Sequence, residues 1–431
     1  MEFFEKLLKP ADDYNVSVGL VLIIFVAAFF TFLPDPLVSR GLSIARDYLP
    51  LWATIVLLFV FKERWMEYVM AKTFFELDRV LLEIKLPEEI TQSPLAMETA
   101  LNAFYYTGEP DTPYKKYIMG VTRSQFSLEI VSFEGDIRFF IQTRRGNQAT
   151  IEAQLYSQYP TIEIYEVPDY MPKIPYDTKK MKLYGIYQKL QKPDPYPIKT
   201  YVDFGLDKET KEEFKIDPLN AVLEQFGALG EGEYGLLQII IRSHQAEKRA
   251  PGKWFEKEDW KGEAKRELES ILSKVKGPKD STISFRMFTE GEKKTMEALE
   301  RNTAKKPFDV GIRIIYLAKI DKYRKDRQGT LPTMMRTFED HGSNGFKPIF
   351  LGSTYPWEDP FEWRENARKR EIYEGYRLRS YLTPPNEAHH PFVLSSEELA
   401  TIFHFPGLVA QTPTLSRIAS RKEEAPPNLP S

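Results

Sequence analysis

Two long apolar runs near the N-terminus constrain this chain more than any other feature. The first, Val16–Leu33, holds 18 residues without a charge. A helix of that length spans about 27 Å, close to the ~30 Å hydrocarbon core of a bilayer. The second run, Tyr48–Phe61, holds 14 residues, and Pro34 and Pro36 separate it from the first. Because proline ends helices, the two runs predict a transmembrane helical hairpin.

Each run has a second interpretation. The first could be a signal peptide, but no small-residue cleavage pattern follows Leu33. The second is short enough for a buried or interfacial helix. Trp52 and Trp65 at its ends suit the two membrane interfaces, and Lys62 can extend its amine to the headgroups. The hairpin is the better interpretation, because only a short turn separates the runs.

Positive charges set the predicted orientation. They lie before the first run, between the runs and after the second, at Lys6, Lys9, Arg40, Arg46, Lys62, Arg64, Lys72 and Arg79. This distribution favours a cytoplasmic N-terminus and a cytoplasmic main body. We therefore expect a multi-pass protein of the inner (cytoplasmic) membrane, with the bilayer as its first partner.

The composition excludes several classes of function. The 431 residues include no cysteine, which removes disulfides, thiol nucleophiles and cysteine-ligated metals. The formal net charge is only −3, so the chain as a whole gives no sign of binding nucleic acid. The hydrophobic fraction of 42% and the charged fraction of 28% are typical of a globular body.

After the anchor and a juxtamembrane helix, residues 1–75, the pattern changes to alternating strands and helices. Residues 76–175 predict the order β-α-β-β-α-β, the split-βαβ or ferredoxin-like arrangement. Glu134-Gly135 forms the turn of the central hairpin, and Ser93-Pro94 caps the first helix. The expected elements cover Val80–Leu86, Ser93–Phe104, Phe126–Ser132, Ile137–Thr143, Asn147–Ser157 and Thr161–Val167.

Residues 176–325 look like a second copy of this module. Asp217-Pro218 repeats the cap of the first module, and a strongly apolar strand follows at Gly235–Arg242. A charged insertion, residues 245–289, interrupts the copy; it is either a solvated surface segment or an arm that docks a partner. The remaining expected elements are strands at Lys182–Gln188, Thr200–Phe204 and Asp309–Lys319 and helices at Asp217–Phe226 and Glu290–Ala304.

The rest of the chain predicts helices and then a flexible tail. Residues 326–410 form the helical C-terminal segment, with a loop expected at 342–355 and a capping box at Ser395 or Ser396. Residues 411–431 hold too few apolar side chains to order themselves. The fold class is therefore α+β: a transmembrane helical hairpin, two ferredoxin-like modules and a helical C-terminal segment.

Motifs of known chemistry are missing from the sequence. It contains no G-x-x-x-x-G-K-[ST], no G-x-S-x-G and no H-E-x-x-H. His389 and His390 are adjacent and would point apart on most backbones, and no carboxylate pattern supports them as ligands. We expect no catalytic residue, no cofactor and no metal, and hence a protein that is not an enzyme.

One stretch near residues 363–381 combines basic and aromatic side chains, as single-stranded nucleic acid sites do. Four glutamates in the same stretch favour instead an amphipathic helix with its basic residues in solvent. Both interpretations stay open. The candidate nucleic-acid contacts are Arg364, Arg368, Lys369, Arg370, Arg377 and Arg379, and the candidate partner-docking residues, on the short helix that follows, are Leu399, Ile402 and Phe403.

Several segments resemble one known family. They are Gln92–Ala103, Phe126–Ser132, Ile151–Pro160, Leu394–Pro406, Thr412–Leu415 and Ser420–Pro430. Together they resemble the N-terminal, membrane-anchored half of conjugative coupling-protein and HerA-like (type IV secretion-type) ATPases of candidate-phyla bacteria. In that class a "PPNLP"-like stretch leads into the motor domain, whereas this sequence ends at Ser431. The P-loop and acidic motifs of the motor are missing, so no ATPase residue is carried over.

The resemblance implies a membrane-tethered, non-enzymatic scaffold. It would position a separate cytoplasmic P-loop ATPase, with DNA or protein cargo, in a type IV secretion-like or DNA-transfer machine. The alternative is a motor-independent structural or adaptor protein of the membrane that binds other proteins. DNA binding and self-association as a homo-oligomer both stay open from the sequence.

Overall fold

The computed structural model describes most of the chain after the first apolar run. It covers residues 40–41, 43, 47–87, 90, 92–105, 108, 110, 112–208, 217–246, 257, 259–276, 289–340, 342–350, 362–387, 391–407 and 417–418. The run Val16–Leu33 and the dipeptide His389-His390 lie outside these residues. The chain divides into two compact units, Met1–Tyr68 and Val69–Ser431.

In the first unit the described residues are mainly those of helix α4 (Leu49–Glu76), which contains the second apolar run and extends into the second unit. From Leu57 to Phe61 each side chain is exposed, by between 49% and 66%. No helix among the residues covered by the structure is both long enough and apolar enough to cross a membrane. The run is cut short because Lys62, Glu63 and Arg64 follow it directly.

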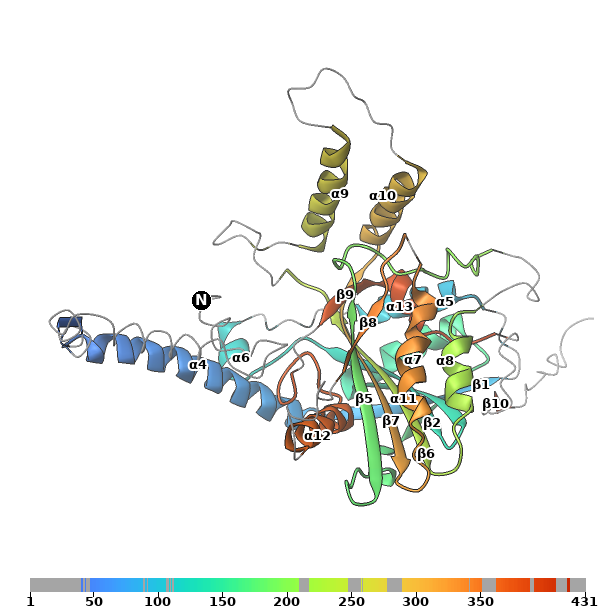
Figure 1. Cartoon of the computed structure of the whole chain (residues 1–431), viewed down its shortest axis with the longest axis horizontal. Coiled ribbons are helices and arrows are strands. Elements are labelled where there is room, and N and C mark those ends of the chain that lie inside the picture. Colours follow the sequence, from blue (N-terminus) through green and yellow to red (C-terminus); the bar gives the residue numbers. More distant parts are fainter. Residues whose placement is uncertain are drawn as a thin grey trace, which may run out of the picture. The chain divides into compact units, whose positions relative to one another are not determined.

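The second unit is an α+β fold built on one antiparallel sheet of nine strands (Figure 1). Strand β4 pairs with β1, the order then continues β1-β3-β2-β6-β7-β5-β8, and β9 pairs with β7. The predicted fold class, α+β, is confirmed at this level. The nine strands are β1 (Arg79–Pro87), β2 (Gln125–Phe133), β3 (Asp136–Arg144), β4 (Glu163–Val167), β5 (Met181–Leu190), β6 (Glu233–Ser243), β7 (Pro307–Lys319), β8 (Phe346–Phe350) and β9 (Phe392–Ser395).

The first half of the sheet has its elements where the sequence places them. Helix α5 (Pro94–Leu101) follows β1, and α7 (Gln148–Gln158) follows β3. Ser93 is the N-cap of α5 as expected, although its side chain makes no capping hydrogen bond. At the β2–β3 turn Gly135 has φ +98°, and a Cβ there would meet the Leu229 carbonyl oxygen at 2.8 Å. This position therefore requires glycine.

In the second half of the sheet, which contains β5, β6, β7 and β8, the order of elements along the chain differs from the predicted one. Residues 200–204 form no strand, because Thr200 and Tyr201 bond to helix α13 (Ser396–Ile402) and not to a strand. The fourth strand of this half is β8, inside the stretch expected to be a loop, so this half extends past the predicted boundary at residue 325. It also contains α8 (Asn220–Gly227), α11 (Asp326–Thr330) and the 3₁₀ helix η5 (Leu331–Phe338).

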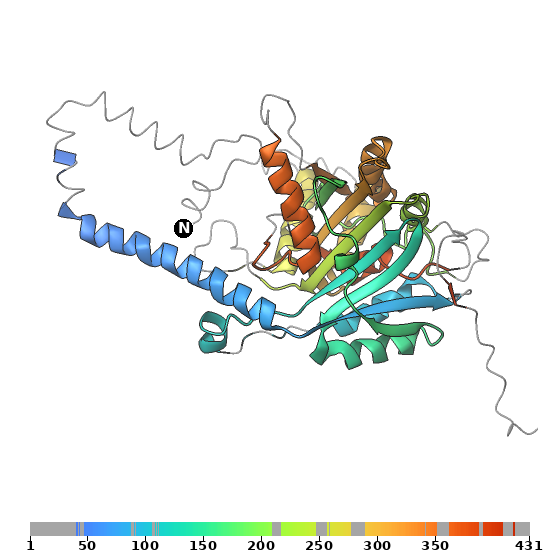
Figure 2. The ribbon, with the colours of Figure 1, turned by 90° about the horizontal axis from the view of Figure 1, so that it is seen from below.

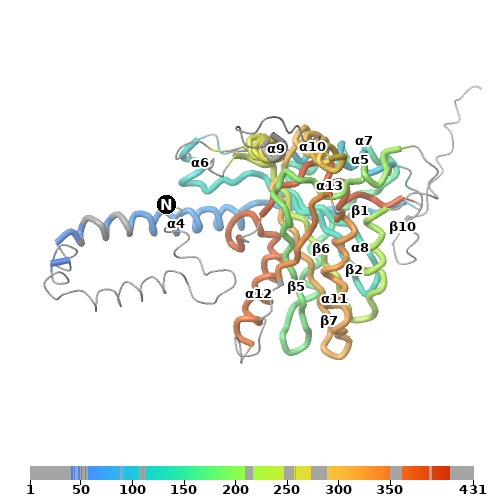
Figure 3. The backbone as a smooth tube through the Cα atoms, turned by 45° about the horizontal axis from the view of Figure 1, so that its top comes forward, coloured from blue at the N-terminus to red at the C-terminus, as the bar shows by residue number. Residues whose placement is uncertain are grey.

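Two helices stand between the neighbouring strands β6 and β7. They are α9 (Trp260–Lys276) and α10 (Glu290–Thr303), which pack on each other (Figure 3). The sequence assigns α10 to the second module as its second helix. The pairing instead places it inside the β6–β7 connection, together with the charged insertion.

The two faces of the sheet bury different side chains. In β2 the alternate residues Phe126, Leu128 and Ile130 join a large apolar core with α5, α7, α8, η5 and α13 (Ser396–Ile402). The other face carries Val131 and is covered by α12 (Trp363–Leu378). Figure 2 shows α12 and α7 on opposite sides of the sheet. Below, these are called the helix face and the α12 face.

The C-terminal end of the described chain reaches the sheet edge. Arg417 and Ile418 form β10, which pairs in parallel with Leu86 and Pro87 of β1. The flexible tail predicted for residues 411–431 is described only at these two residues, and the rest lies outside the described part.

Candidate functional site: an arginine-lined hollow

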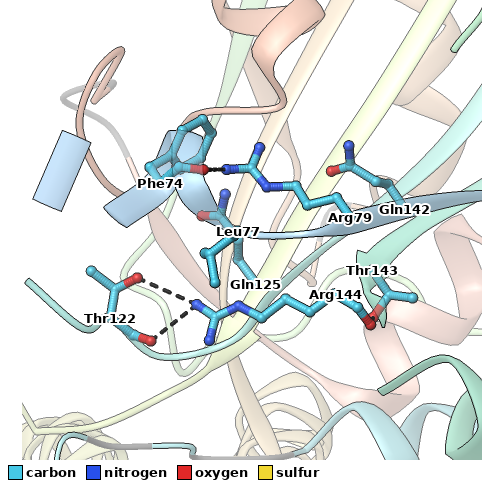
Figure 4. A pocket seen from close by; sticks show the side chains of 8 residues that line it. All are labelled: Phe74, Leu77, Arg79, Thr122, Gln125, Gln142, Thr143 and Arg144. Carbon is cyan, nitrogen blue, oxygen red and sulfur yellow. Dashed lines mark hydrogen bonds between the residues drawn. The ribbon is translucent and has the colours of Figure 1, made fainter. Parts of the chain in front are cut away.

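A shallow hollow, with room for about one water molecule, opens on the α12 face at one end of strands β1 and β3. Arg79 of β1 stands directly opposite Arg144 of β3 in the strand register. Two arginines side by side are unusual, since like charges directly opposite each other destabilise a sheet. The lining residues, drawn in Figure 4, are Phe74, Leu77, Arg79, Thr122, Gln125, Gln142, Thr143 and Arg144.

Backbone carbonyl groups hold both guanidinium groups in place. Arg79 donates to the carbonyl oxygen of Leu378 at 3.2 Å and to that of Phe74, and it lies 3.5 Å above the Phe74 ring centroid. Leu378 ends α12 and Phe74 lies in the last turn of α4, where carbonyl groups carry partial negative charge. Arg144 donates to the carbonyl oxygen of Thr122 at 3.0 Å. Helix ends therefore stabilise part of the positive charge.

The electrostatics of the hollow favour an anion. Burial, together with the nearby charges of Arg144 and Arg379, lowers the pKa of Arg79 to about 10. A lowered arginine pKa means that its surroundings disfavour further positive charge. An anionic group at the mouth of the hollow would offset this unfavourable environment, but the hollow itself, with room for about one water molecule, is too small to enclose a phosphate.

Next to the hollow, the middle of the α12 face contains a buried ion-pair network. Arg379 is 2% exposed, donates to Glu129 at 2.9 Å and binds Asp169 at 2.8 Å. Tyr170 donates its hydroxyl to Glu129 at 2.6 Å, and Gln238 donates its amide to the same carboxylate at 3.0 Å. Burial opposes the charge of Arg379, but Glu129 and Asp169 raise its pKa well above the ordinary value. Each charged side chain in the network therefore has a hydrogen-bonding partner of opposite charge.

Arg313 of β7 lies in the same row of the sheet as Gln238 and Glu129. It is 1% exposed, donates to the carbonyl oxygen of Ser380 and lies 4.9 Å from the Tyr381 ring centroid. Burial lowers the pKa of this guanidinium. The aromatic ring and the carbonyl group are the compensation that the structure gives it.

The helix face has its own buried polar cluster, at the start of α13. Ser395 and Glu398 form the predicted capping box, with both hydrogen bonds present. Glu398 also accepts from the backbone N–H of Ile198 at 2.9 Å. Burial raises the pKa of Glu398 to about 7, although the N–H donors act against this rise. The neighbouring Glu397 is paired with Arg301 at 3.2 Å.

The structure separates the six predicted nucleic-acid contacts. Arg364, Arg370 and Arg377 are exposed on α12, and Arg377 pairs with Glu374 at 2.6 Å. Arg379 is fully engaged in the buried network, so its prediction as a phosphate contact is wrong. The other two, Arg368 and Lys369, are half-buried, and Lys369 pairs with Glu365 at 2.6 Å.

The three predicted docking residues are also placed differently. Leu399 and Phe403 are 0% exposed and Ile402 is 1% exposed, all within the core of the helix face. Their helix packs on the body, and these side chains are therefore not available to another protein. Among the described residues, no group of three or more histidine or carboxylate side chains is arranged to hold a metal ion.

Sequence comparison places most of the body in one family. Residues 112–417 match the model of a family described as "Domain of unknown function (DUF8128)". The chain belongs to this family. A comparison with curated proteins found no match. The DUF8128 match includes Thr122, Gln125 and Arg144 of the hollow, while Arg79 and the end of α4 precede it.

No local pattern in the sequence indicates the hollow. Arg79 and Arg144 are 65 positions apart, at the start of one strand and the end of another. Each pattern predicts its own strand but not the register between them. If the two predicted strands are aligned antiparallel, with the start of one beside the end of the other, Arg79 and Arg144 come to lie side by side.

Proposed function

We propose that this DUF8128 protein is a membrane-tethered, non-enzymatic scaffold that positions a cytoplasmic P-loop ATPase in a type IV secretion-like or DNA-transfer machine. The observation that carries the membrane part is the exposure of five consecutive apolar side chains, Leu57–Phe61, on α4. Soluble proteins rarely expose such contiguous apolar surface, which marks a membrane or protein interaction site. The run Val16–Leu33 supplies the second arm of the proposed hairpin.

The body suits a scaffold because its sheet contains two four-stranded parts with the same strand order. We infer two ferredoxin-like modules from the strand orders β4-β1-β3-β2 and β8-β5-β7-β6, each with its helices on the helix face. Strands β2 and β6 pair over nine residues and join the two modules into one sheet. A buried network on the α12 face pairs Arg379 with Glu129 and Asp169, which supports a structural role for these residues.

Membrane attachment and orientation are tested together on the full chain. It should remain in the membrane pellet after an alkaline carbonate wash. Because the chain lacks cysteine, single cysteines report sidedness: Ser39→Cys, in the predicted turn and outside the described residues, should react with an impermeant maleimide added to intact cells. Ser157→Cys, exposed on α7, should react only after lysis. Release by the wash, or labelling of Ser157→Cys from outside, would overturn the tethered, cytoplasmic model.

The ATPase part is tested at the C-terminal segment, where the resembling ATPases continue into their motor. Deleting residues 419–431 keeps the β10 pairing with β1 and removes the proline-rich end. The full chain should co-purify a P-loop ATPase identified by mass spectrometry, and the deletion should lose it while its circular dichroism stays unchanged. Equal recovery of the ATPase by both would refute the proposal that residues 419–431 bind the ATPase. Recovery only of proteins without a P-loop would favour the alternative adaptor role.

A further inference from the structure

A second apolar surface lies on the body itself, beside the last turns of α4. Helix α6 (Pro113–Tyr117) and the two residues after it expose Tyr114 by 63%, Ile118 by 52% and Met119 by 49%. These side chains do not belong to either core of the sheet.

The segment is held rigidly although its side chains point to solvent. Thr112 caps α6 by accepting from the backbone N–H of Lys115 at 3.3 Å. Thr73 of α4 donates its hydroxyl to the Met119 carbonyl oxygen. Gly120, with φ +63°, approaches the Val69 backbone so closely that a Cβ would collide with it. These contacts hold the exposed apolar side chains in a fixed position. In a flexible loop the same side chains could turn away from the solvent.

Charge gives this surface a second property. Lys115 and Lys116 are exposed between Tyr114 and Tyr117. Two residues after Gly120 the same segment reaches Thr122, which lines the arginine-lined hollow. Apolar, aromatic and cationic groups thus follow one another along a few residues. Aromatic rings with lysines are typical of the membrane interface, whereas lysine is depleted in the cores of protein interfaces.

We propose that the segment Tyr114–Met119 inserts into the headgroup layer of a membrane that contains anionic phospholipid, with Lys115 and Lys116 binding the headgroup phosphates. This inference rests on the proposed membrane attachment. Each lysine near an anionic leaflet contributes on the order of 1 kcal/mol of attraction, so the contact depends on lipid charge. It makes the body lie against the bilayer at a defined surface.

The test uses the full chain, reconstituted in vesicles of phosphatidylcholine alone or of phosphatidylcholine and phosphatidylglycerol in equal parts. Ile118→Cys carries an environment-sensitive fluorophore, and lipids with nitroxide quenchers report its depth. The fluorophore should be quenched in the anionic vesicles and much less in the neutral ones. Ser157→Cys on α7 is the matched control and should stay unquenched in both.

The lysines are then tested in the same assay. Lys115→Gln with Lys116→Gln should lower the ratio of embedded to water-exposed fluorophore by about five-fold per lysine. Lys293→Gln with Lys294→Gln, exposed on α10, is the charge-matched control and should change nothing.

Two outcomes would overturn the inference. One is an unquenched Ile118→Cys fluorophore in anionic vesicles that have retained the protein, which leaves attachment intact and refutes the surface contact. The other is full release of the fluorophore by excess inorganic phosphate, which would assign the cationic groups to free phosphate. Loss of the protein from all vesicles would instead show that the proposed attachment itself is wrong.

Discussion

Two buried carboxylates, one on each face of the sheet, have their charge compensated in different ways. On the α12 face, Arg379 and Glu129 are opposite charges in direct contact. On the helix face, the Glu398 carboxylate accepts backbone N–H groups of Ser395 and Ile198. An ion pair remains charged over a wide pH range, whereas a carboxylate held by neutral donors in a dry site takes up a proton readily. The type of compensation therefore decides how each of these two carboxylates responds to mutation and to pH.

The largest effect is expected on the α12 face. Arg379→Met would leave Glu129 buried without its partner, which typically costs about 3–5 kcal/mol of unfolding free energy. Arg377→Met, two residues earlier in the chain, removes an exposed pair with Glu374 and should cost less than about 1 kcal/mol. Urea denaturation of the full chain in detergent, followed by circular dichroism, measures both. Equal losses for the two variants would mean that burial of the Arg379–Glu129 pair does not increase the cost of breaking it.

The second effect, a pH dependence, belongs to the helix face. The folded-state pKa of Glu398 is raised from 4.5 to about 7, so its contribution to stability is present below 4.5 and is lost as the pH rises toward 7. This contribution is on the order of 3 kcal/mol. Burial opposes the charge of His404, but Asp217 at 3.0 Å raises the pKa of this histidine above its ordinary value. The stability that the His404–Asp217 pair contributes is therefore also lost as the pH rises through the pKa that His404 has in the folded state.

The unfolding free energy of the full chain should therefore fall between pH 5 and pH 8 on account of these two groups. Glu398→Gln should flatten the profile below pH 7, and His404→Gln should flatten its upper part. Glu292→Gln, in the exposed capping box of α10, is the matched control and should keep the wild-type profile. A Glu398→Gln profile with the wild-type slope would assign the pH dependence elsewhere.

The sequence predicts the helix face better than the α12 face. The hairpin at 126–143 and the capping box at Ser395 are local patterns, and alternation or spacing is enough to find them. The network around Arg379 joins β2, β6 and the end of α12, so it depends on pairings between distant segments. Arg379 adopts a left-handed conformation, φ 53°, that ends α12 and turns its side chain into the body. Nothing in the local pattern of basic and aromatic residues indicates that turn.

The errors in the second half have the same origin. Strand β8 at Phe346–Phe350 follows a stretch rich in Gly, Ser and Asn, and its pairing with β5 decides its conformation. Residues 200–204 have a composition typical of a strand, yet Thr200 and Tyr201 bond to Glu397 and Thr401 of α13. The paired arginines of the hollow were missed for this reason too: register is a tertiary property, and only the antiparallel alignment of β1 and β3 places them together.

The third prediction concerns packing on the α12 face. A Cβ at Gly311 of β7 would lie 2.2 Å from the Tyr381 ring, which is buried on this side. Gly311→Ala should therefore cost about 1–3 kcal/mol, as overpacking does. Gly146→Ala, with no atom within 4 Å of the added carbon, is the control and should change the unfolding free energy by less than about 0.5 kcal/mol. A neutral Gly311→Ala would mean that Tyr381 moves aside freely and that this face is loosely packed.

The smallest effect compares the two capping boxes. Ser395 and Thr289 make the same pair of hydrogen bonds, with Glu398 and Glu292 respectively, but the first box is buried and the second is exposed. Loss of a cap costs about 1 kcal/mol, and water can replace the bond only where it has access. We therefore expect Thr289→Ala to cost about 0.5–1 kcal/mol and Ser395→Ala about 2 kcal/mol. Urea denaturation at pH 6 measures the difference, and a Thr289→Ala loss equal to or larger than that of Ser395→Ala would show that burial does not strengthen the cap of α13.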